Sequence, residues 1–341
     1  MTTWTKVDRF RANLAGEPAD RPAVSAYAHI VEAERNADDL VKASLDYGLT
    51  WDWDWIKLNP RTVHYAEAWG NTYDYDRYGK FIPIPEQLTA VLTAPTELGR
   101  ITRLAARDVP QFQEQLEVVR RVKAGAQGAA VVATLYSPFN VFLKLGGLPL
   151  APNFLPPGST TPLTFEDFVK ADRAGVHRAL RAIADTLAEY AALQREAGAD
   201  GLVYVVANTT STLGEAYREF AQPYDNIVLD GAAGIPRIVH TCGADAHPQW
   251  FEEFPLEGVN WDTFEPSNPG PEVLTKTVFV GGVNAGLLGG LQPDVPLAQT
   301  IAEQAAASRA VTDNRLVLAP SCSISAAAPA EALKAFRAAA E

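Results

Sequence analysis

Cysteine is scarce in this chain of 341 residues, which contains only Cys242 and Cys322. The two positions lie 80 residues apart (322 − 242), and two cysteines cannot form the disulfide framework of a small secreted domain. A reducing compartment would keep both side chains as thiols. The cysteine content therefore favours a cytoplasmic protein and leaves both sulfur atoms free for other chemistry.

The chain also lacks an excess of basic residues. It has 29 Lys and Arg against 41 Asp and Glu, which gives a formal net charge of −12. Such a balance disfavours nucleic acid and anionic membrane surfaces as partners. No stretch approaches the roughly 20 apolar residues that span a bilayer, and the amphipathic pattern of residues 1–14 has no apolar signal-peptide core. We expect a cytoplasmic protein that binds neither nucleic acids nor membranes.

Linkers, charge runs and low-complexity tracts are absent as well, so we expect a single domain over residues 1–341. Short apolar stretches alternate with amphipathic patterns. The expected strands cover residues 23–28, 51–58, 129–135, 201–206, 237–240, 258–260, 278–282 and 316–319. The expected helices cover residues 110–125, 298–310, 330–340 and a long segment that begins at Thr164 as N-cap and ends near Glu196.

Eight strands separated mostly by helices predict a (β/α)₈ TIM barrel with an insertion between the second and third strands that includes residues 73–87. An open doubly wound sheet is the alternative, but it usually has a glycine-rich phosphate loop after its first strand. The sequence there, YAHIVEAE at residues 27–34, contains no glycine. We therefore favour the barrel, in which functional residues lie at the carboxyl ends of the strands.

Both cysteines follow expected strands. Residues 236–247 read PRIVHTCGADAH, so Cys242 comes two positions after His240, and residues that far apart in an extended chain project to the same side. Barrel closure would bring Cys242 near Cys322, because the latter follows the eighth strand. One imidazole and two thiols suit a zinc ion with an open fourth position. The alternative is that both cysteines are small buried hydrophobic residues.

Several segments resemble the uroporphyrinogen decarboxylase superfamily. They are WTKVDRFRANLAGEPADRPAVSA at the start, GEAYREFAQPYDNIV (214–228), PRIVHTCG, EGVNWDTFEPSNPGPE (257–272), VFVGGVNAGLL (278–288) and the closing RLVLAPSCSISAAAPAEALKAF. The resemblance covers nearly the whole chain and implies the same barrel. The superfamily includes decarboxylases of haem synthesis and zinc methyltransferases that move a methyl group from a corrinoid protein to a thiol such as coenzyme M.

The motifs favour the methyltransferase branch. The decarboxylases share an RQAGRY segment after the first strand, an aspartate after the second and a Gly-His-Gly at the end of the eighth, where this chain has YAHIVEAE, IKLNPR (56–61) and Ser321-Cys322-Ser323. The methyltransferases share a His-x-Cys-Gly and a late Ala-Pro-x-Cys, as this chain does. The resemblance implies that His240, Cys242 and Cys322 are zinc ligands.

Two departures from that pattern affect the expected site. The methyltransferases usually end in Pro-Gly-Cys-Gly, whereas serine occupies both glycine positions here, so we expect a reshaped loop around Cys322. Some relatives have an acidic fourth zinc ligand. Asp245 and Glu265 are the candidates for it here, and water or substrate is the alternative.

Polar residues at the ends of the other expected strands are candidates for substrate binding. Lys57 and Arg61 could hold a carboxylate, sulfonate or phosphate, or else be solvated charges at the rim. His29 could contact substrate or metal, or be a structural histidine. The full set of substrate-binding candidates is His29, Lys57, Asn59, Arg61, Tyr136, Asn208, Asp262 and Asn284.

The function we expect is a zinc-dependent methyl or alkyl transferase that activates a thiol. One alternative is a decarboxylase of a tetrapyrrole or related carboxylic acid, which needs no metal. The other is a non-catalytic relative that binds metal or corrinoid. The expected partners are a small thiol or acid substrate, a corrinoid protein that carries the methyl donor, and a second copy of the chain.

Overall fold

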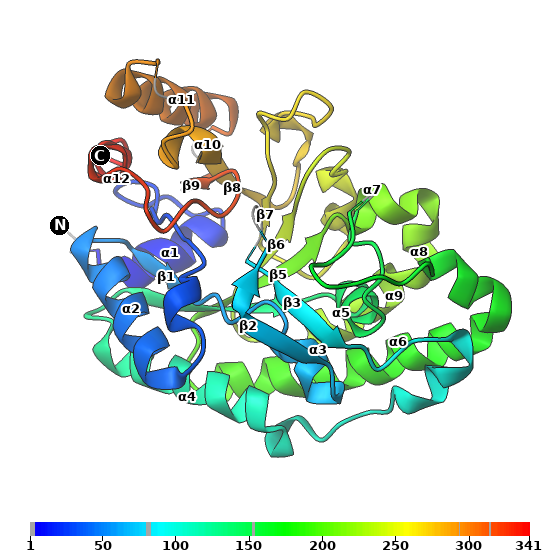
Figure 1. Ribbon diagram of the computed structural model, residues 1–341. Coiled ribbons are helices and arrows are strands. Elements are labelled where there is room, and N and C mark those ends of the chain that lie inside the picture. The colour runs from blue at the N-terminus through cyan, green and yellow to red at the C-terminus, as the bar shows by residue number, and fades with distance from the viewer. Residues whose placement is uncertain (1–3, 80–82, 152–153, 293, 314) are drawn as a thin grey trace.

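A curled parallel sheet forms the centre of the molecule (Figure 1). The computed structural model describes residues 4–79, 83–151, 154–292, 294–313 and 315–341. Within these ranges the sheet has seven strands in the order β1-β4-β5-β6-β7-β8-β9, all parallel. They are β1 (Trp55–Lys57), β4 (Ala130–Tyr136), β5 (Gly201–Ala207), β6 (Arg237–Thr241), β7 (Gly258–Asn260), β8 (Val278–Val283) and β9 (Leu316–Pro320).

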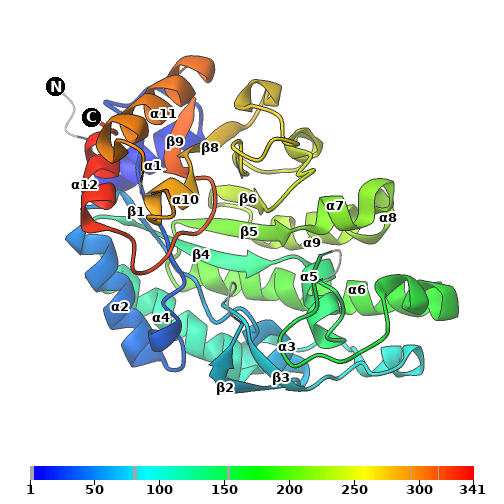
Figure 2. The same cartoon turned by 45° about the horizontal axis from the view of Figure 1, so that its top comes forward.

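Helices cover the outer face of the sheet (Figure 2). The helices are α1 (Lys6–Leu14), α2 (Ala37–Thr50), α3 (His64–Trp69), α4 (Pro110–Gly125), α5 (Pro138–Leu145), α6 (Phe165–Glu196), α7 (Thr209–Leu213), α8 (Tyr217–Phe220), α9 (Gln222–Gly231), α10 (Ala285–Leu288), α11 (Leu297–Val311) and α12 (Ala330–Ala338). In the described ranges, no helix is both long enough and apolar enough to cross a membrane.

The central strands are apolar on both faces because both faces are buried. Along β4, Val131, Ala133 and Leu135 belong to the core between the sheet and the helices. Ala130 and Val132 alternate with them and belong to a second core inside the curl. This explains why the sequence showed continuous apolar runs rather than alternating ones.

Helix α1 closes the amino-terminal end of the curled sheet. Phe10 and Leu14 belong to the inner core together with residues from β1, β8 and β9. The ring of Phe10 lies 5.7 Å from that of Trp55 in β1, and a Cβ at Gly201 in β5 would lie 3.2 Å from the Phe10 ring. Strands from opposite ends of the strand order therefore share one interior.

The first expected strand is not a regular strand. Residues 23–28 form two isolated parallel bridges, Val24 with Leu318 and Ala28 with Ile324. On the other side, the Asp54 N–H donates to the Val24 carbonyl at 2.9 Å. The segment therefore lies between β9 and β1, but it bonds too sparsely to continue the sheet on both sides.

The second expected strand is much shorter than residues 51–58. Helix α2 continues to Thr50, and the chain then turns through Asp52, which has a φ of +55°. Strand β1 begins only at Trp55. The segment WDWDW (51–55) does not divide into a packed and a polar face, because Trp53, Asp54 and Trp55 are all buried.

A two-stranded antiparallel hairpin, β2 (Thr72–Tyr78) with β3 (Pro85–Thr89), lies between β1 and β4 in the chain. This is the segment where the sequence predicted an insertion over residues 73–87, of which residues 80–82 lie outside the described ranges. The Tyr78 hydroxyl donates to Glu34 at 2.8 Å. The hairpin is thereby bonded to the segment that follows residues 23–28.

The other predicted elements are confirmed within one or two residues at each end. Thr164 caps α6 as expected: its hydroxyl accepts from the Asp167 N–H, and the Asp167 carboxylate accepts from the Thr164 N–H at 2.9 Å. Pro110 is the first residue of α4. These signals are local, which is why the sequence alone identified them.

Candidate metal centre

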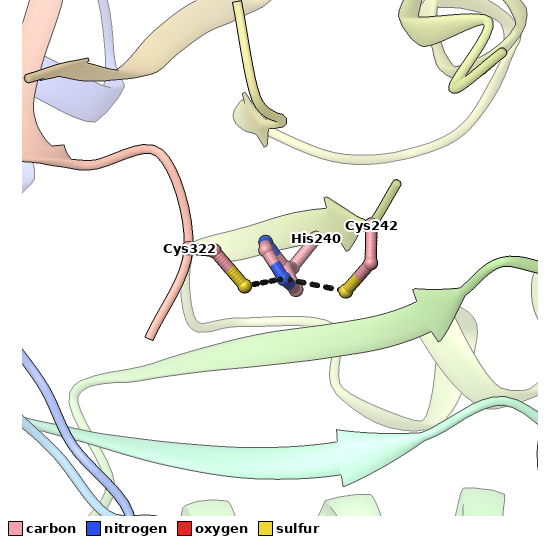
Figure 3. A group of neighbouring side chains, drawn as sticks. All are labelled: His240, Cys242 and Cys322. Carbon is pink, nitrogen blue, oxygen red and sulfur yellow. Dashed lines mark hydrogen bonds between the residues drawn. The ribbon is translucent and has the colours of Figure 1, made fainter. Parts of the chain in front are cut away.

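Three side chains from distant parts of the chain point toward one another at the carboxyl end of the sheet (Figure 3). His240 is in β6, Cys242 follows β6, and Cys322 follows β9. The His240 Nε2 atom lies 2.9 Å from the Cys242 Sγ and 3.6 Å from the Cys322 Sγ. The three potential ligand atoms all lie within 4.8 Å of one another, so the predicted convergence is observed.

The backbone of β6 places His240 and Cys242 on the same side. The strand continues through Thr241, and the Cys242 N–H donates to the Ala207 carbonyl of β5 at 3.1 Å. The chain then turns at Gly243, which has a φ of +75°. A Cβ there would lie 2.7 Å from the Asn208 Oδ1, so this position requires glycine for conformation and for space.

The loop that carries Cys322 uses one of the serines that distinguish this chain. The Ser321 N–H donates to the Val283 carbonyl at 2.8 Å. The Ser321 hydroxyl accepts from the Ala285 N–H at 3.1 Å, at the start of α10. The serine therefore fastens the Cys322 loop to the end of β8, where a glycine would leave that amide without this partner.

Asn260 orients the imidazole of His240. The two residues are register partners in β6 and β7, and the Asn260 Oδ1 accepts a hydrogen bond from His240 Nδ1. The Asn260 amide nitrogen donates to the Val280 carbonyl and, at 3.2 Å, to the Pro320 carbonyl. Because both of these acceptors are carbonyls, the amide oxygen must face the histidine. His240 is thus held with its proton on Nδ1 and its Nε2 lone pair toward the sulfurs.

The pKa values of the two thiols are shifted in opposite directions. The hydrogen bond with Cys242 outweighs the effect of burial and lowers the pKa of Cys322 well below that of an ordinary thiol. The hydrogen bond to Cys322 and burial raise the pKa of Cys242. The cluster therefore favours one thiolate in the absence of a cation and has a second thiol that a cation would deprotonate.

The donor set fits zinc. Zinc takes sulfur at about 2.3 Å and nitrogen at about 2.0 Å in a tetrahedron, which places nitrogen and sulfur ligands about 3.6 Å apart. The Cys322–His240 separation of 3.6 Å matches this value, and the Cys242–His240 separation of 2.9 Å is somewhat shorter. Among the described residues no carboxylate joins the cluster. Asp245 and Glu265 are therefore not the fourth ligand in this structure.

A partly buried lysine from β1, Lys57, lies beside the cluster. The Lys57 ammonium donates to Asn59 Oδ1 at 2.8 Å and lies 4.6 Å from the ring centre of Tyr27. Burial lowers the pKa of Lys57 to about 8, although the two cysteines act to raise it. Asn59 is itself held by donation to the Ala28 carbonyl at 2.9 Å. Lys57 and Asn59, both predicted from the sequence, are thus neighbours of the metal centre.

The sequence analysis missed a second lysine, Lys144 in α5. Its ammonium donates to the Thr62 carbonyl at 2.8 Å and lies 3.8 Å from the ring centre of Tyr136. Burial lowers its pKa to about 7. The signal that could have identified it is its isolation, because PFNVFLKL has no other charged residue and every position of α5 is buried.

His29 lies among these groups. Burial, followed by the charges of Lys57 and Lys144, lowers the pKa of His29 to about 3, so its imidazole is neutral. Its Nδ1 is buried and has no hydrogen-bond partner among the described residues. The structure therefore places His29 near the centre but does not include it in the ligand cluster.

The remaining predicted residues have other contacts in this structure. Arg61 forms ion pairs with Glu67 at 2.8 Å and Glu114 at 3.0 Å. Asn284 caps α10, where its Oδ1 accepts from the Leu287 N–H at 2.9 Å. Asp262 lies near the centre, because its charge contributes to raising the pKa of Cys242. A substrate role for Arg61, Asn208, Asp262 or Asn284 remains a prediction.

Asn260 and Tyr27 are the other residues that sequence reasoning missed. The Tyr27 hydroxyl donates at 3.1 Å to Asn260 Oδ1, the same atom that accepts from His240. The candidates were chosen just past the strands, whereas Asn260 is the last residue of β7 and is buried. The signal that could have identified Asn260 is an amide side chain at the end of an apolar strand next to the strand of His240.

Fold and site together define an α/β protein with a curled parallel sheet and a His-Cys-Cys cluster at its carboxyl edge. The family model described as uroporphyrinogen decarboxylase (URO-D) matches residues 5–341. The chain therefore belongs to the uroporphyrinogen decarboxylase family, as the sequence motifs indicated. No curated protein matches the chain at a significant level.

Solved structures of methyltransferases share the fold. A methyltransferase from Methanosarcina mazei superimposes with a TM-score of 0.74 at 18% identity, covering 99% of this chain and 98% of that one. A B12-independent methionine synthase from Shewanella sp. W3-18-1, in complex with selenomethionine, superimposes with a TM-score of 0.57 at 12% identity, covering 94% of each chain. At such identities these similarities establish the fold only.

Proposed function

We propose that this protein is a zinc-dependent methyl or alkyl transferase that activates a thiol substrate. The observation that carries the proposal is the convergence of His240, Cys242 and Cys322 at the carboxyl edge of the sheet. A structural zinc site usually has four protein ligands, whereas a catalytic site keeps one position for water or substrate. A three-ligand set that no carboxylate of the described residues completes supports a catalytic site.

Zinc held by these ligands would bind a substrate thiol as its thiolate, which is the nucleophilic form. The residues around the cluster orient the ligand atoms for a metal ion. Asn260 holds the proton of His240 on Nδ1 and so leaves Nε2 free for metal. With a neutral imidazole and two thiolates, the loaded site has a net charge near zero. A bound substrate thiolate would make the site anionic, and this charge would raise the reactivity of the sulfur.

The reaction we propose is a simple displacement. The bond between the alkyl carbon and its carrier breaks, a carbon–sulfur bond forms, the carrier leaves with the bonding electron pair, and the thiol proton passes to solvent. A methyl-corrinoid on a partner protein is the donor we favour on the resemblance to the methyltransferase branch. A cytoplasmic location and self-association of the chain are further parts of this proposal.

A metal-free decarboxylase of a carboxylic acid is the second candidate, since the family model bears that description and two lysines flank the centre. The two candidates differ in their need for metal. The decarboxylase would release carbon dioxide from a tetrapyrrole acid without zinc, and it would give the cysteine–histidine cluster no role.

The test is thiol methylation with methylcobalamin as donor and 2-mercaptoethanesulfonate as acceptor. We expect loss of the methyl–cobalt absorbance and formation of the methyl thioether, abolished by a chelator and restored by added zinc. The Cys322→Ala variant should be inactive under all of these conditions, and Lys334→Gln, which changes an exposed residue of α12, should behave as the unchanged protein. Transfer that is insensitive to chelator and to Cys322→Ala would contradict the proposal.

A further inference from the structure

Two ammonium groups near the His-Cys-Cys cluster, that of the buried Lys144 and that of the partly buried Lys57, have no carboxylate partner among the described residues. Lys57 and Lys144 belong to β1 and α5, and each donates one described hydrogen bond, to Asn59 Oδ1 and to the Thr62 carbonyl respectively. Among the described ion pairs neither lysine appears, whereas Arg61 nearby pairs with two glutamates. Buried charges without an opposite charge are costly and are therefore usually paired.

The two lysines point to one locality. Asn59, which accepts from the Lys57 ammonium, also donates to the carbonyl of Ala28, the residue before His29, and accepts from the Thr134 hydroxyl at 3.4 Å. The ammonium of Lys57 lies over the ring of Tyr27 and that of Lys144 over the ring of Tyr136, which is two residues after Thr134 in β4. The Tyr27 hydroxyl donates to Asn260, the residue that holds His240. The lysines are therefore arranged around the same metal centre.

Each ammonium has N–H groups that have no acceptor among the described residues. A lysine side chain has three N–H groups, and a neutral amide or carbonyl oxygen accepts only one of them in each case here. The ring faces of Tyr27 and Tyr136 stabilise the cations without neutralising them. The buried and unpartnered Nδ1 of His29 adds a polar atom that no described residue satisfies. An incoming oxyanion would satisfy these groups together.

We infer that Lys57 and Lys144, together with His29, form a subsite for an oxyanion group of the substrate, such as a carboxylate. The inference rests on the proposed function for the position of the reacting sulfur, but the subsite itself requires only the two lysines. It makes these residues determinants of specificity: the reacting group lies at the cysteine–histidine cluster, and the charged end lies between the lysines.

The test compares binding of 3-mercaptopropionate with that of its neutral analogue 3-mercaptopropionamide by calorimetry on the zinc-loaded protein. We expect the acid to bind at least about tenfold more tightly, because a buried charged hydrogen bond contributes about 1.5 kcal/mol or more. The Lys57→Gln and Lys144→Gln variants should each remove most of that preference and change amide binding little. The exposed control Lys334→Gln should keep the preference in full.

A second arm separates this inference from the proposed function. Propionate has no sulfur, so its binding to the metal-free protein reports on the subsite alone. Binding that depends on both lysines and competes with the thiol places the anion on the thiol substrate. Binding that depends on both lysines without competing with the thiol places the anion on the alkyl donor. Either result supports the subsite even if the protein binds no zinc.

Folding of the variants is controlled with Lys144→Arg, which keeps the charge, and by thermal unfolding of every variant. Lys144→Arg should retain at least part of the preference that Lys144→Gln loses. The inference is overturned if acid and amide bind equally and propionate does not bind. It is equally overturned if folded Lys57→Gln and Lys144→Gln proteins keep the full preference for the acid.

Discussion

Charged side chains are paired with opposite charges at the amino-terminal end of the sheet, but the lysines at its carboxyl end are not. At the amino-terminal end, Asp54 is fully buried just before β1 and accepts from Arg9 at 2.7 Å, from Arg21 at 2.6 Å and from the Val24 N–H at 2.9 Å. At the carboxyl end, the ammonium groups of Lys57 and Lys144 donate to neutral oxygens, lie over aromatic rings and pair with no carboxylate among the described residues. The paired charges at the amino-terminal end, called the compensated end, stabilise the fold. At the carboxyl end, a bound ligand would supply the charge that the lysines lack.

The largest effect should follow from breaking the compensated end. Asp54→Ala leaves Arg9 and Arg21 buried without their shared carboxylate, and we expect a loss of about 3–5 kcal/mol in the free energy of unfolding. Urea denaturation measures it. The control is Asp52→Ala, which removes exposed ion pairs with Lys6 and Arg337 and should cost less than about 1 kcal/mol. Equal losses would refute the contrast.

The carboxyl end contains a carboxyl group whose burial is not compensated in the same way. Glu34 is 1% exposed, accepts from Tyr78 at 2.8 Å, and has no described partner on Oε2. Burial raises its pKa from 4.5 to about 7. The folded protein therefore holds this proton more strongly than the unfolded chain does, and the resulting stability is present below pH 4.5 and lost as the pH rises to about 7.

Glu34→Gln removes this titration. Relative to the variant, the unchanged protein should lose up to about 1.4 kcal/mol of unfolding free energy per pH unit between about pH 4.5 and 7, with no further loss above that range. Urea denaturation of both proteins at several pH values measures the difference. A difference that does not vary with pH would show that Glu34 is ionised in the folded state like a compensated carboxylate.

Asn260 tests whether orientation of His240 matters for metal binding. We expect Asn260→Ala to weaken zinc affinity by about 10–100-fold, since it removes the group that holds the proton on Nδ1. Competition with a chromogenic zinc chelator measures it. Asn284→Ala is the control, because it removes a helix cap and should lower stability by about 1 kcal/mol without altering zinc affinity. Equal affinities in both variants would contradict the role given to Asn260.

The smallest effect should come from Ser321, which stands where methyltransferase relatives usually have glycine. Ser321→Gly removes the acceptor of the Ala285 N–H, and we expect a loss of about 0.5–1.5 kcal/mol in stability. Zinc stoichiometry should not change, since Cys322 itself is kept. Thermal unfolding and metal analysis of the same samples check both statements, and loss of zinc would show that the serine also positions the ligand loop.

Local signals in the sequence were sufficient for most of the fold. The capping pattern at Thr164, the proline that begins α4 and the apolar runs of β4 and β5 each identify an element from adjacent residues. Residues 23–28 were different, because their pairing depends on strands far away in the chain, and only two isolated bridges form. Their apolar character correctly predicted that they are buried, but it wrongly predicted that they form a regular strand.

The sequence predicted the site residues that belong to rare residue types and missed those that belong to common ones. Cys242 and Cys322 are the only cysteines, so their positions after strands predicted the cluster that the structure shows. Asn260 and Lys144 are ordinary residue types, and their roles depend on the register of β6 with β7 and on the placement of α5 beside β4. Those relationships arise only when the sheet curls.

The central claim is that the three converging side chains bind zinc, and metal content tests it most directly. The purified protein and its Cys322→Ala variant should be exposed to the same limiting zinc and then analysed by elemental mass spectrometry after desalting. The account predicts about one zinc per chain in the unchanged protein and little in the folded variant. Little zinc in both proteins, or equal zinc in both, would contradict it.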